Sequence, residues 1–244
     1  MKKWAKAFLP KATWSYLSQV RQRWFDTYAE KSYSQEGEDM VLARFLEHRP
    51  SGFYVDVGAH HPKRFSNTYA LYRKGWRGLN IDANPGSMAL FHDIRPRDIN
   101  IEAAISSAPQ ELTYYIFNDP ALNTFQKDLA LKRAGGTYSI IKEVSIVTAP
   151  LRQLLDQYVP AGTVIDLMTI DVEGLDYDVL QSNDWSRYSP EFILVECFGA
   201  ATLEEASSDP VARLLSQHHY SMVAKSMNTV FFKLTQPNSA DVIR

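Results

Sequence analysis

The stretch FYVDVGAHHPKRFSNTYALYRKGWRGLNIDANP, residues 53–85, decides the fold. It opens with an apolar run typical of a buried strand, turns at Gly58, and reaches a second apolar run at 77–81. The segment between these runs, 66–74, has the pattern of a helix. A strand, a helix and a strand in this order form a unit whose two strands are parallel.

The same alternation continues along the chain. Further strands are predicted at 98–105, 111–117, 164–170 and 191–196, and helices at 85–94, 151–158, 176–181 and 203–218. The closing strands, 220–225 and 229–234, have only three residues between them and must be antiparallel. The sequence therefore predicts an α/β chain with a Rossmann-like, mostly parallel seven-stranded sheet and an antiparallel C-terminal hairpin. This is the class I methyltransferase fold rather than that of a dinucleotide dehydrogenase.

Composition restricts the classes of protein to consider. The 244 residues are 45% hydrophobic and 22% charged, which suits a globular domain. A net charge of −2 gives no reason to expect a nucleic-acid partner. Cys197 is the only cysteine, and no apolar run approaches the roughly 18 residues that span a bilayer. The start is also a poor signal peptide, so we expect a cytoplasmic protein.

The first 25 residues differ from the rest. They hold six basic side chains, no acidic ones and several aromatic ones, and 11–28 has helical spacing; a second helix is predicted at 36–48. Either the segment contacts the inner face of an anionic membrane peripherally, or it packs its aromatic face on the domain or on a second subunit of a homodimer. We expect a helical extension at 1–31, one domain at 32–236 and a tail at 237–244.

A nucleotide site is predicted where the first two strands end. Gly58 lets the backbone turn sharply, but the loop has one glycine instead of the G-x-G-x-x-G that cradles a pyrophosphate. S-adenosylmethionine, which carries no phosphate, fits this loop better. Asp82 ends the second strand a little over 20 residues later and is placed to bind both ribose hydroxyls; alternatively, it caps a helix beginning at Pro85. Asp56 could orient the loop or receive the ammonium group of the ligand.

Other residues complete the predicted cofactor site. Residues 103–105, which end the third strand, would form a wall against adenine, although they suit an ordinary core equally well. Asn67 either caps a helix or lies against the methionine end. The predicted cofactor-binding set is Asp56, Gly58, Ala59, Asn67, Asp82, Ala83, Asn84, Ala104, Ile105 and Asp171.

Several longer motifs resemble the FkbM family of methyltransferases. They are YSQEGED (33–39), FYVDVGAHHPKRFSNT (53–68), GWRGLNIDANP (75–85), PRD (96–98), ALNTF (121–125) and IDVEGLD (170–176). The resemblance covers about 33–198 in the correct order and spacing. It implies methylation dependent on S-adenosylmethionine, most often of hydroxyls on sugars or secondary metabolites, and many relatives are associated with polysaccharide assembly. The acceptor is thus expected to be a small molecule or a glycan.

The chemistry of transfer points to a group of acidic residues. A neutral hydroxyl acceptor must lose its proton, which requires a base or a metal ion. Asp171 and Glu173 follow one strand and Glu196 ends the next, so three carboxylates meet at one sheet edge. They could pair with Lys63, Arg64 or a donor such as His60, divide into a base and a helix cap, or bind Mg²⁺.

We predict Asp171, Glu173 and His60 as catalytic residues without a metal, and Asp171, Glu173 and Glu196 as the metal-binding alternative. His60 is either a base or a structural donor. Asn123 and Thr124 lie in an irregular insertion that is expected to cover the acceptor. The competing function is a non-catalytic module that keeps the fold and the cofactor.

Overall fold

The computed structural model describes residues 10–24, 28–197 and 199–235, and the chain divides into two compact units, 1–32 and 33–244. In the first unit the described helix is α2 (Lys11–Trp24), shorter than the predicted 11–28. The remaining basic and aromatic residues of 1–9, and the predicted tail at 237–244, lie outside the described ranges. Within those ranges, no helix combines the length and the apolar character needed to cross a bilayer. The membrane or packing role of the N-terminal segment stays a prediction.

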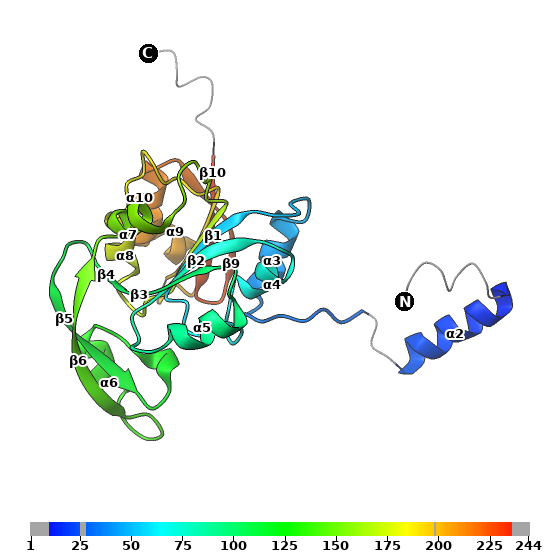
Figure 1. Cartoon of the computed structure of the whole chain (residues 1–244), viewed down its shortest axis with the longest axis horizontal. Coiled ribbons are helices and arrows are strands. Elements are labelled where there is room, and N and C mark those ends of the chain that lie inside the picture. Colours follow the sequence, from blue (N-terminus) through cyan, green and yellow to red (C-terminus); the bar gives the residue numbers. More distant parts are fainter. Residues whose placement is uncertain (1–9, 25–27, 198, 236–244) are drawn as a thin grey trace, which may run out of the picture. The chain divides into compact units, whose positions relative to one another are not determined.

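The second unit is built on a seven-stranded sheet, as predicted (Figure 1). Five strands are parallel and the last two are antiparallel to their neighbours. In spatial order they are β3 (Ile99–Glu102), β2 (Arg77–Asp82), β1 (Phe53–Val57), β7 (Leu167–Ile170), β8 (Phe192–Glu196), β10 (Thr229–Leu234) and β9 (Tyr220–Ser226). The order reverses at β1, and the expected class I methyltransferase fold is confirmed.

Helices cover both faces of this sheet because successive strand residues point to opposite sides. Val55 and Val57 pack in one apolar core, whereas Tyr54 lies in the other. The first core is covered by α7 (Leu151–Tyr158), α8 (Asp176–Gln181), α9 (Leu203–Ser208) and α10 (Pro210–Gln217). The second is covered by α3 (Glu38–Phe45) and α4 (Tyr69–Arg73), which Figure 1 shows apart from α7 and α10.

A small second sheet is the main feature that the sequence did not predict. It contains β4 (Ala104–Ile105), β6 (Ile140–Ala149) and β5 (Glu111–Phe117), with the short helices η1 (Pro120–Leu122) and α6 (Lys127–Arg133) in the β5–β6 connection. The predicted strand at 98–105 is consequently divided between two sheets. The N–H of Ala103 donates to the carbonyl of Asp82 at 3.0 Å, and the next residues pair with β6 instead of β2.

Several helix predictions were wrong in their bounds, and for two of them the structure shows the reason. The helix expected from Pro85 is α5 (Met88–Ile94), because the residues around Pro85 form a turn. The helix expected at 203–218 is two helices, α9 and α10. The Asp209 side chain accepts a hydrogen bond from Val211 N–H at 2.8 Å and caps α10, while Pro210 has no N–H with which to continue α9.

A buried group, called here the arginine cluster, joins β1 to the residues that follow α5. Arg95 is fully buried; its Nε lies 2.8 Å from Asp98, and its terminal nitrogens donate to Tyr54 Oη at 2.7 Å and to Thr68 Oγ1 at 3.0 Å. Thr68 in turn donates to Asp56 at 2.5 Å. The charge of Asp98 is therefore compensated by Arg95, whereas burial raises the pKa of Asp56 against the opposing effects of Arg95 and the Thr68 hydroxyl.

Candidate active site

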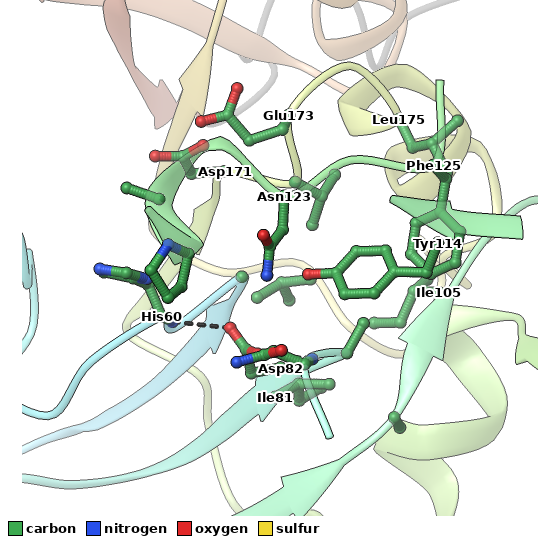
Figure 2. A pocket seen from close by; sticks show the side chains of 18 of the residues that line it. His60, Ile81, Asp82, Ile105, Tyr114, Asn123, Phe125, Asp171, Glu173 and Leu175 are labelled. Carbon is green, nitrogen blue, oxygen red and sulfur yellow. Dashed lines mark hydrogen bonds between the residues drawn. The ribbon is translucent and has the colours of Figure 1, made fainter. Parts of the chain in front are cut away.

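A pocket lies at the carboxyl ends of β1, β2 and β7, where the strand order reverses. Open α/β sheets bind ligands in this position. Figure 2 shows Asp82 on one side of the pocket and Asp171 with Glu173 on another. Of the predicted cofactor residues, those that line the pocket are Gly58, Asp82, Ala83, Asn84, Ile105 and Asp171.

Gly58 holds the turn after β1 tightly against β7. Its φ of 81° is in the left-handed region, and a Cβ added there would lie 1.7 Å from the carbonyl oxygen of Asp171. The N–H groups of Gly58 and Ala59 both donate to Ile81 O, at 2.9 and 3.0 Å. Glycine is thus required for two reasons: the sharp turn expected from the sequence and the close approach of two backbones.

Asp82 fixes the loop that faces it. Its two carboxylate oxygens accept the backbone N–H of His60 at 2.7 Å and of Asn84 at 2.8 Å, and Figure 2 marks the first of these bonds. Burial raises the pKa of Asp82, while these N–H groups oppose the rise. Because α5 begins only at Met88, Asp82 does not cap it. Each oxygen keeps a further lone pair, so the ribose role is compatible with the geometry and stays a prediction.

The opposite side carries the carboxyl cluster, which we define as Asp171, Glu173 and Glu196. One oxygen from each lies within 4.8 Å of the others. Glu173 forms an ion pair with Arg133 of α6. The protein atoms around Asp171 and the charges of Glu196 and Glu173 raise the pKa of Asp171, although its side chain is open to the pocket. Burial raises the pKa of Glu196 to about 8, with a further contribution from Glu173.

The loop after β7 is held by the insertion and by α8. Glu173 has a left-handed φ of 55°, and its carbonyl accepts the Thr124 hydroxyl at 2.8 Å. Asp176 accepts the N–H groups of Val172 at 3.2 Å and Gly174 at 3.1 Å. Burial raises the pKa of Asp176 to about 7 against these bonds. Thr124, expected to cover the acceptor, instead fixes the backbone beside the cluster.

His60 lines the pocket with a side chain that is largely enclosed. Its φ of 51° is left-handed, and its Nε2 is buried without a hydrogen-bond partner among the described residues. Burial, followed by the charge of Arg64, lowers the pKa of His60. The ring is therefore neutral near pH 7 and could accept a proton, so both predicted roles remain open.

Four residues predicted to bind the cofactor do not line this pocket. Asp56 belongs to the arginine cluster, and Ala59 packs against Met88 and Phe91. Asn67 donates to Thr169 at 3.1 Å and faces a neighbouring cavity. Ala104 is buried in β4, while Ala103 and Ile105 on either side reach the pocket. Their cofactor roles stay predictions, and the geometry supports only an indirect contribution.

Sequence reasoning missed residues that the second sheet brings to the pocket. Tyr114 of β5 and Phe125 lie with ring centroids 4.5 Å apart and form part of its wall. Asn123, expected over the acceptor, lines the same pocket; its Oδ1 accepts Phe117 N–H at 2.8 Å, and its Nδ2 has no partner among the described residues. Gln35 also lines the pocket, from outside the second sheet, and was missed although it lies in the YSQEGED motif.

The donor set fits S-adenosylmethionine. Among the described residues, the pocket lining contains the carboxylates of Asp82, Asp171 and Glu173 but no lysine or arginine. A negative lining suits a sulfonium and an ammonium cation, and it disfavours the phosphates of a dinucleotide. The unpartnered Asn123 Nδ2 offers a buried donor, and Tyr114 and Phe125 offer flat apolar surfaces for a base.

Comparisons with solved structures return methyltransferases at low identity. An O-methyltransferase from Bacillus cereus in complex with SAH is 11% identical, with coverage of 95% of this chain and 94% of that one and a TM-score of 0.43. A precorrin-6y C5,15-methyltransferase from Geobacter metallireducens is 15% identical, with 85% and 93% covered and a TM-score of 0.41. A TehB-like SAM-dependent methyltransferase from Corynebacterium glutamicum is 12% identical, with 92% and 100% covered and a TM-score of 0.41. Likeness at this level carries no argument about the reaction.

No curated protein matches the chain. The family model described as "Methyltransferase FkbM domain" matches residues 56–222. This match spans most of the chain, from the strand before Gly58 to the first strand of the C-terminal hairpin. The resemblance inferred from the sequence is confirmed: the chain belongs to the FkbM family and is an S-adenosylmethionine-dependent methyltransferase.

Proposed function

We propose that the chain transfers a methyl group to a hydroxyl oxygen of a sugar, a glycan or a secondary metabolite. S-adenosylmethionine, when bound, supplies a methyl carbon already activated by its sulfonium sulfur. The protein must then align the acceptor and remove its proton. The carboxyl cluster is the observation that carries the proposal, because it offers proton acceptors with raised pKa values at one side of the cofactor pocket.

The proposed arrangement places the two ends of the cofactor on different residues. Asp82 would bind the ribose hydroxyls, and Ile105 with Tyr114 would contact the adenine. The methionine end would extend toward Gly58 and Asp171, where a negative charge favours the sulfonium. Oxygen acceptors are favoured over amines because an amine can lose its proton to solvent before attack, whereas a neutral hydroxyl needs a base of this kind.

The test is transfer of a labelled methyl group. Wild-type protein, tritiated S-adenosylmethionine and an extract of source cells that lack the protein should yield labelled product, and Asp82→Asn should yield much less. Analysis of the product by mass spectrometry and acid hydrolysis should place the label on an oxygen. Label on a nitrogen would overturn the oxygen assignment. Binding of the cofactor without any transfer would instead support the non-catalytic module.

A further inference from the structure

The amide side chain of Asn123 lies in the wall of the cofactor pocket with only one of its two ends paired. The residue is 5% exposed, and its Oδ1 accepts the backbone N–H of Phe117 at 2.8 Å. Because an N–H group can only donate, this bond fixes which end of the amide is oxygen and which is nitrogen. Nδ2 is shielded from water and has no acceptor among the described residues. A buried N–H without an acceptor is destabilising, so a ligand that offers one gains affinity there.

The backbone that carries Asn123 is fixed by the residue that follows it. The N–H of Thr124 donates to Tyr115 O at 3.2 Å, and the N–H of Tyr115 donates to Thr124 O at 2.9 Å. The Thr124 hydroxyl also donates to Glu173 O at 2.8 Å, which ties this part of the insertion to the loop after β7. The amide of Asn123 therefore has a set direction, and a ligand that accepts from it does not have to order it first.

Three polar side chains from different elements point into the same part of the pocket. Figure 2 shows Asn123 across from Asp82, with the hydroxyl of Tyr114 directed into the space between them. Burial raises the pKa of Tyr114, the charge of Asp82 raises it further, and the nearby amide of Asn123 opposes the rise without a hydrogen bond of normal geometry. The Tyr114 hydroxyl thus keeps its proton near pH 7 and can donate it. Two donors therefore face one carboxylate.

This arrangement matches the hydrogen-bonding needs of a ribose. Each ribose hydroxyl donates one hydrogen bond and accepts others, whereas an ionised carboxylate only accepts. Asp82 can thus take the protons of the hydroxyls but leaves their oxygen lone pairs without donors. Among the described residues, no lysine or arginine of the pocket lining supplies such a donor, whereas Asn123 and Tyr114 do. The sulfonium and ammonium groups at the other end of the cofactor are cations and have no use for an N–H or O–H donor.

We propose that Asn123 and Tyr114 donate to the ribose hydroxyl oxygens of S-adenosylmethionine, opposite Asp82, and so select a ribonucleoside over its deoxy forms. The inference rests on the proposed function, because it takes the position of the ribose at Asp82 from it. Asn123 is thereby assigned to the cofactor instead of the acceptor that the sequence suggested. The β5–β6 insertion then completes the cofactor site, and the ring of Tyr114 stays available to the adenine.

Asn123→Asp tests the donor while it keeps an oxygen for the N–H of Phe117. In calorimetry this variant should bind S-adenosylhomocysteine about 10-fold or more weakly than wild type. Asn118→Asp is the matched control in the same insertion, because the Asn118 amide also accepts one N–H, from Ser139 at 3.0 Å, and donates to Thr137 O at 2.9 Å, but it is exposed outside the pocket lining. It should stay within about threefold of wild type. Melting curves of both variants without ligand show whether the fold is intact.

Analogues of S-adenosylhomocysteine that lack the 2′- or the 3′-hydroxyl identify the group that each donor meets. Removal of the hydroxyl contacted by Asn123 should weaken binding to wild type by about 10-fold. Asn123→Asp should bind that analogue within about threefold of wild type, because the same hydrogen bond is already lost. Tyr114→Phe keeps the ring and should give the same pattern with one of the two analogues. Tyr115→Phe, whose side chain points to the opposite face of β5, should bind all three ligands like wild type.

The outcomes separate this assignment from its alternatives. Losses from Asn123→Asp that are equal for S-adenosylhomocysteine and both deoxy analogues would overturn the contact with the ribose. So would a loss that disappears with 5′-methylthioadenosine, which keeps the ribose but lacks the amino-acid end. Asp82→Asn with the same analogues tests the ribose position separately. If wild-type protein binds these nucleosides but transfers no label to an oxygen, the proposed function fails, and the binding measurements still decide the role of Asn123.

Discussion

The second unit contains two groups of acidic side chains, one buried and one open to the pocket, and the two groups differ in their partners. The arginine cluster surrounds Asp98 with a fully buried Arg95 and a tyrosine hydroxyl. The carboxyl cluster has one arginine for three acids, and that arginine binds Glu173. A carboxylate matched by a buried cation is held ionised and fixed, whereas one without a cation can exchange a proton. Residue type alone does not reveal this difference.

The largest effect expected from this comparison is on stability. Arg95→Met should lower the free energy of unfolding by about 3–5 kcal/mol, because it leaves the buried charge of Asp98 without its cation. Urea denaturation followed by circular dichroism measures the loss. Arg77→Met, at the exposed start of β2, should change stability by less than about 0.5 kcal/mol. A loss below about 1 kcal/mol for Arg95→Met would remove the contrast between the two clusters.

The next effect concerns cofactor binding on the β2 side. Asp82→Asn should weaken the affinity for S-adenosylhomocysteine by about 10- to 100-fold, since bonds to a charged acceptor contribute about 1.5–3 kcal/mol. The new amide NH₂ would also face the N–H of either His60 or Asn84. Calorimetry measures the affinity, and Glu102→Gln on the neighbouring strand end should remain within about threefold of wild type, which is about 0.7 kcal/mol. Equal affinities for Asp82→Asn and wild type would refute the ribose role.

A smaller effect should appear in the pH dependence of stability. The pKa of Asp176 is about 7 in the folded chain and about 3.9 when unfolded, so the folded state binds this proton more tightly. The resulting stabilisation is complete below about pH 4 and is lost as the pH rises through 7. Asp176→Asn cannot titrate, so wild type should lose at least about 1 kcal/mol relative to it between pH 5 and 8. Denaturation at both pH values checks this, and a constant difference would contradict it.

Metal removal should have no effect. Glu173 is already paired with Arg133, which leaves two carboxyl groups of the cluster, fewer than the oxygen ligands that a divalent cation prefers. Dialysis against EDTA should leave labelled-methyl transfer unchanged, and added Mg²⁺ should not increase it. Loss of transfer that Mg²⁺ restores would favour the metal alternative. A bound cation would then compensate the carboxyl cluster as Arg95 compensates Asp98.

Sequence patterns predicted the parts of the fold that local physics determines. The parallel strands around Gly58 and Asp82 and the antiparallel hairpin follow from apolar runs and short connections. The second sheet was not predictable in this way, because the division at Ala103 depends on pairing with a strand more than 40 residues later. Asp209 and Pro210 do carry a local signal for a break between two helices, because a capping residue is followed by one without an N–H.

The candidate site shows the same division. Asp82, Asp171 and Glu173 could be placed at strand ends because parallel strands bring their carboxyl ends to one edge. Tyr114 could not, since it reaches the pocket only when β5 folds back over it, and Asn123 was expected only as part of an insertion over the acceptor. Asp56 has the motif position of a ligand residue, yet its carboxylate accepts the Thr68 hydroxyl. Thr68 in turn accepts a hydrogen bond from Arg95, which lies 39 residues after Asp56. Strand-end position predicts location, but the partner of each side chain is set by the tertiary fold.

The contact beneath Gly58 has a consequence for how this enzyme can change. No methyl group fits between Gly58 and the carbonyl of Asp171. The loop after β1 and the end of β7 that carries Asp171 therefore cannot move independently of each other. Any side chain at position 58 must push the two strand ends apart and disturb both halves of the reaction together. Variation in acceptor choice is therefore expected in the β5–β6 insertion, while the contact between Gly58 and the end of β7 has to stay as it is.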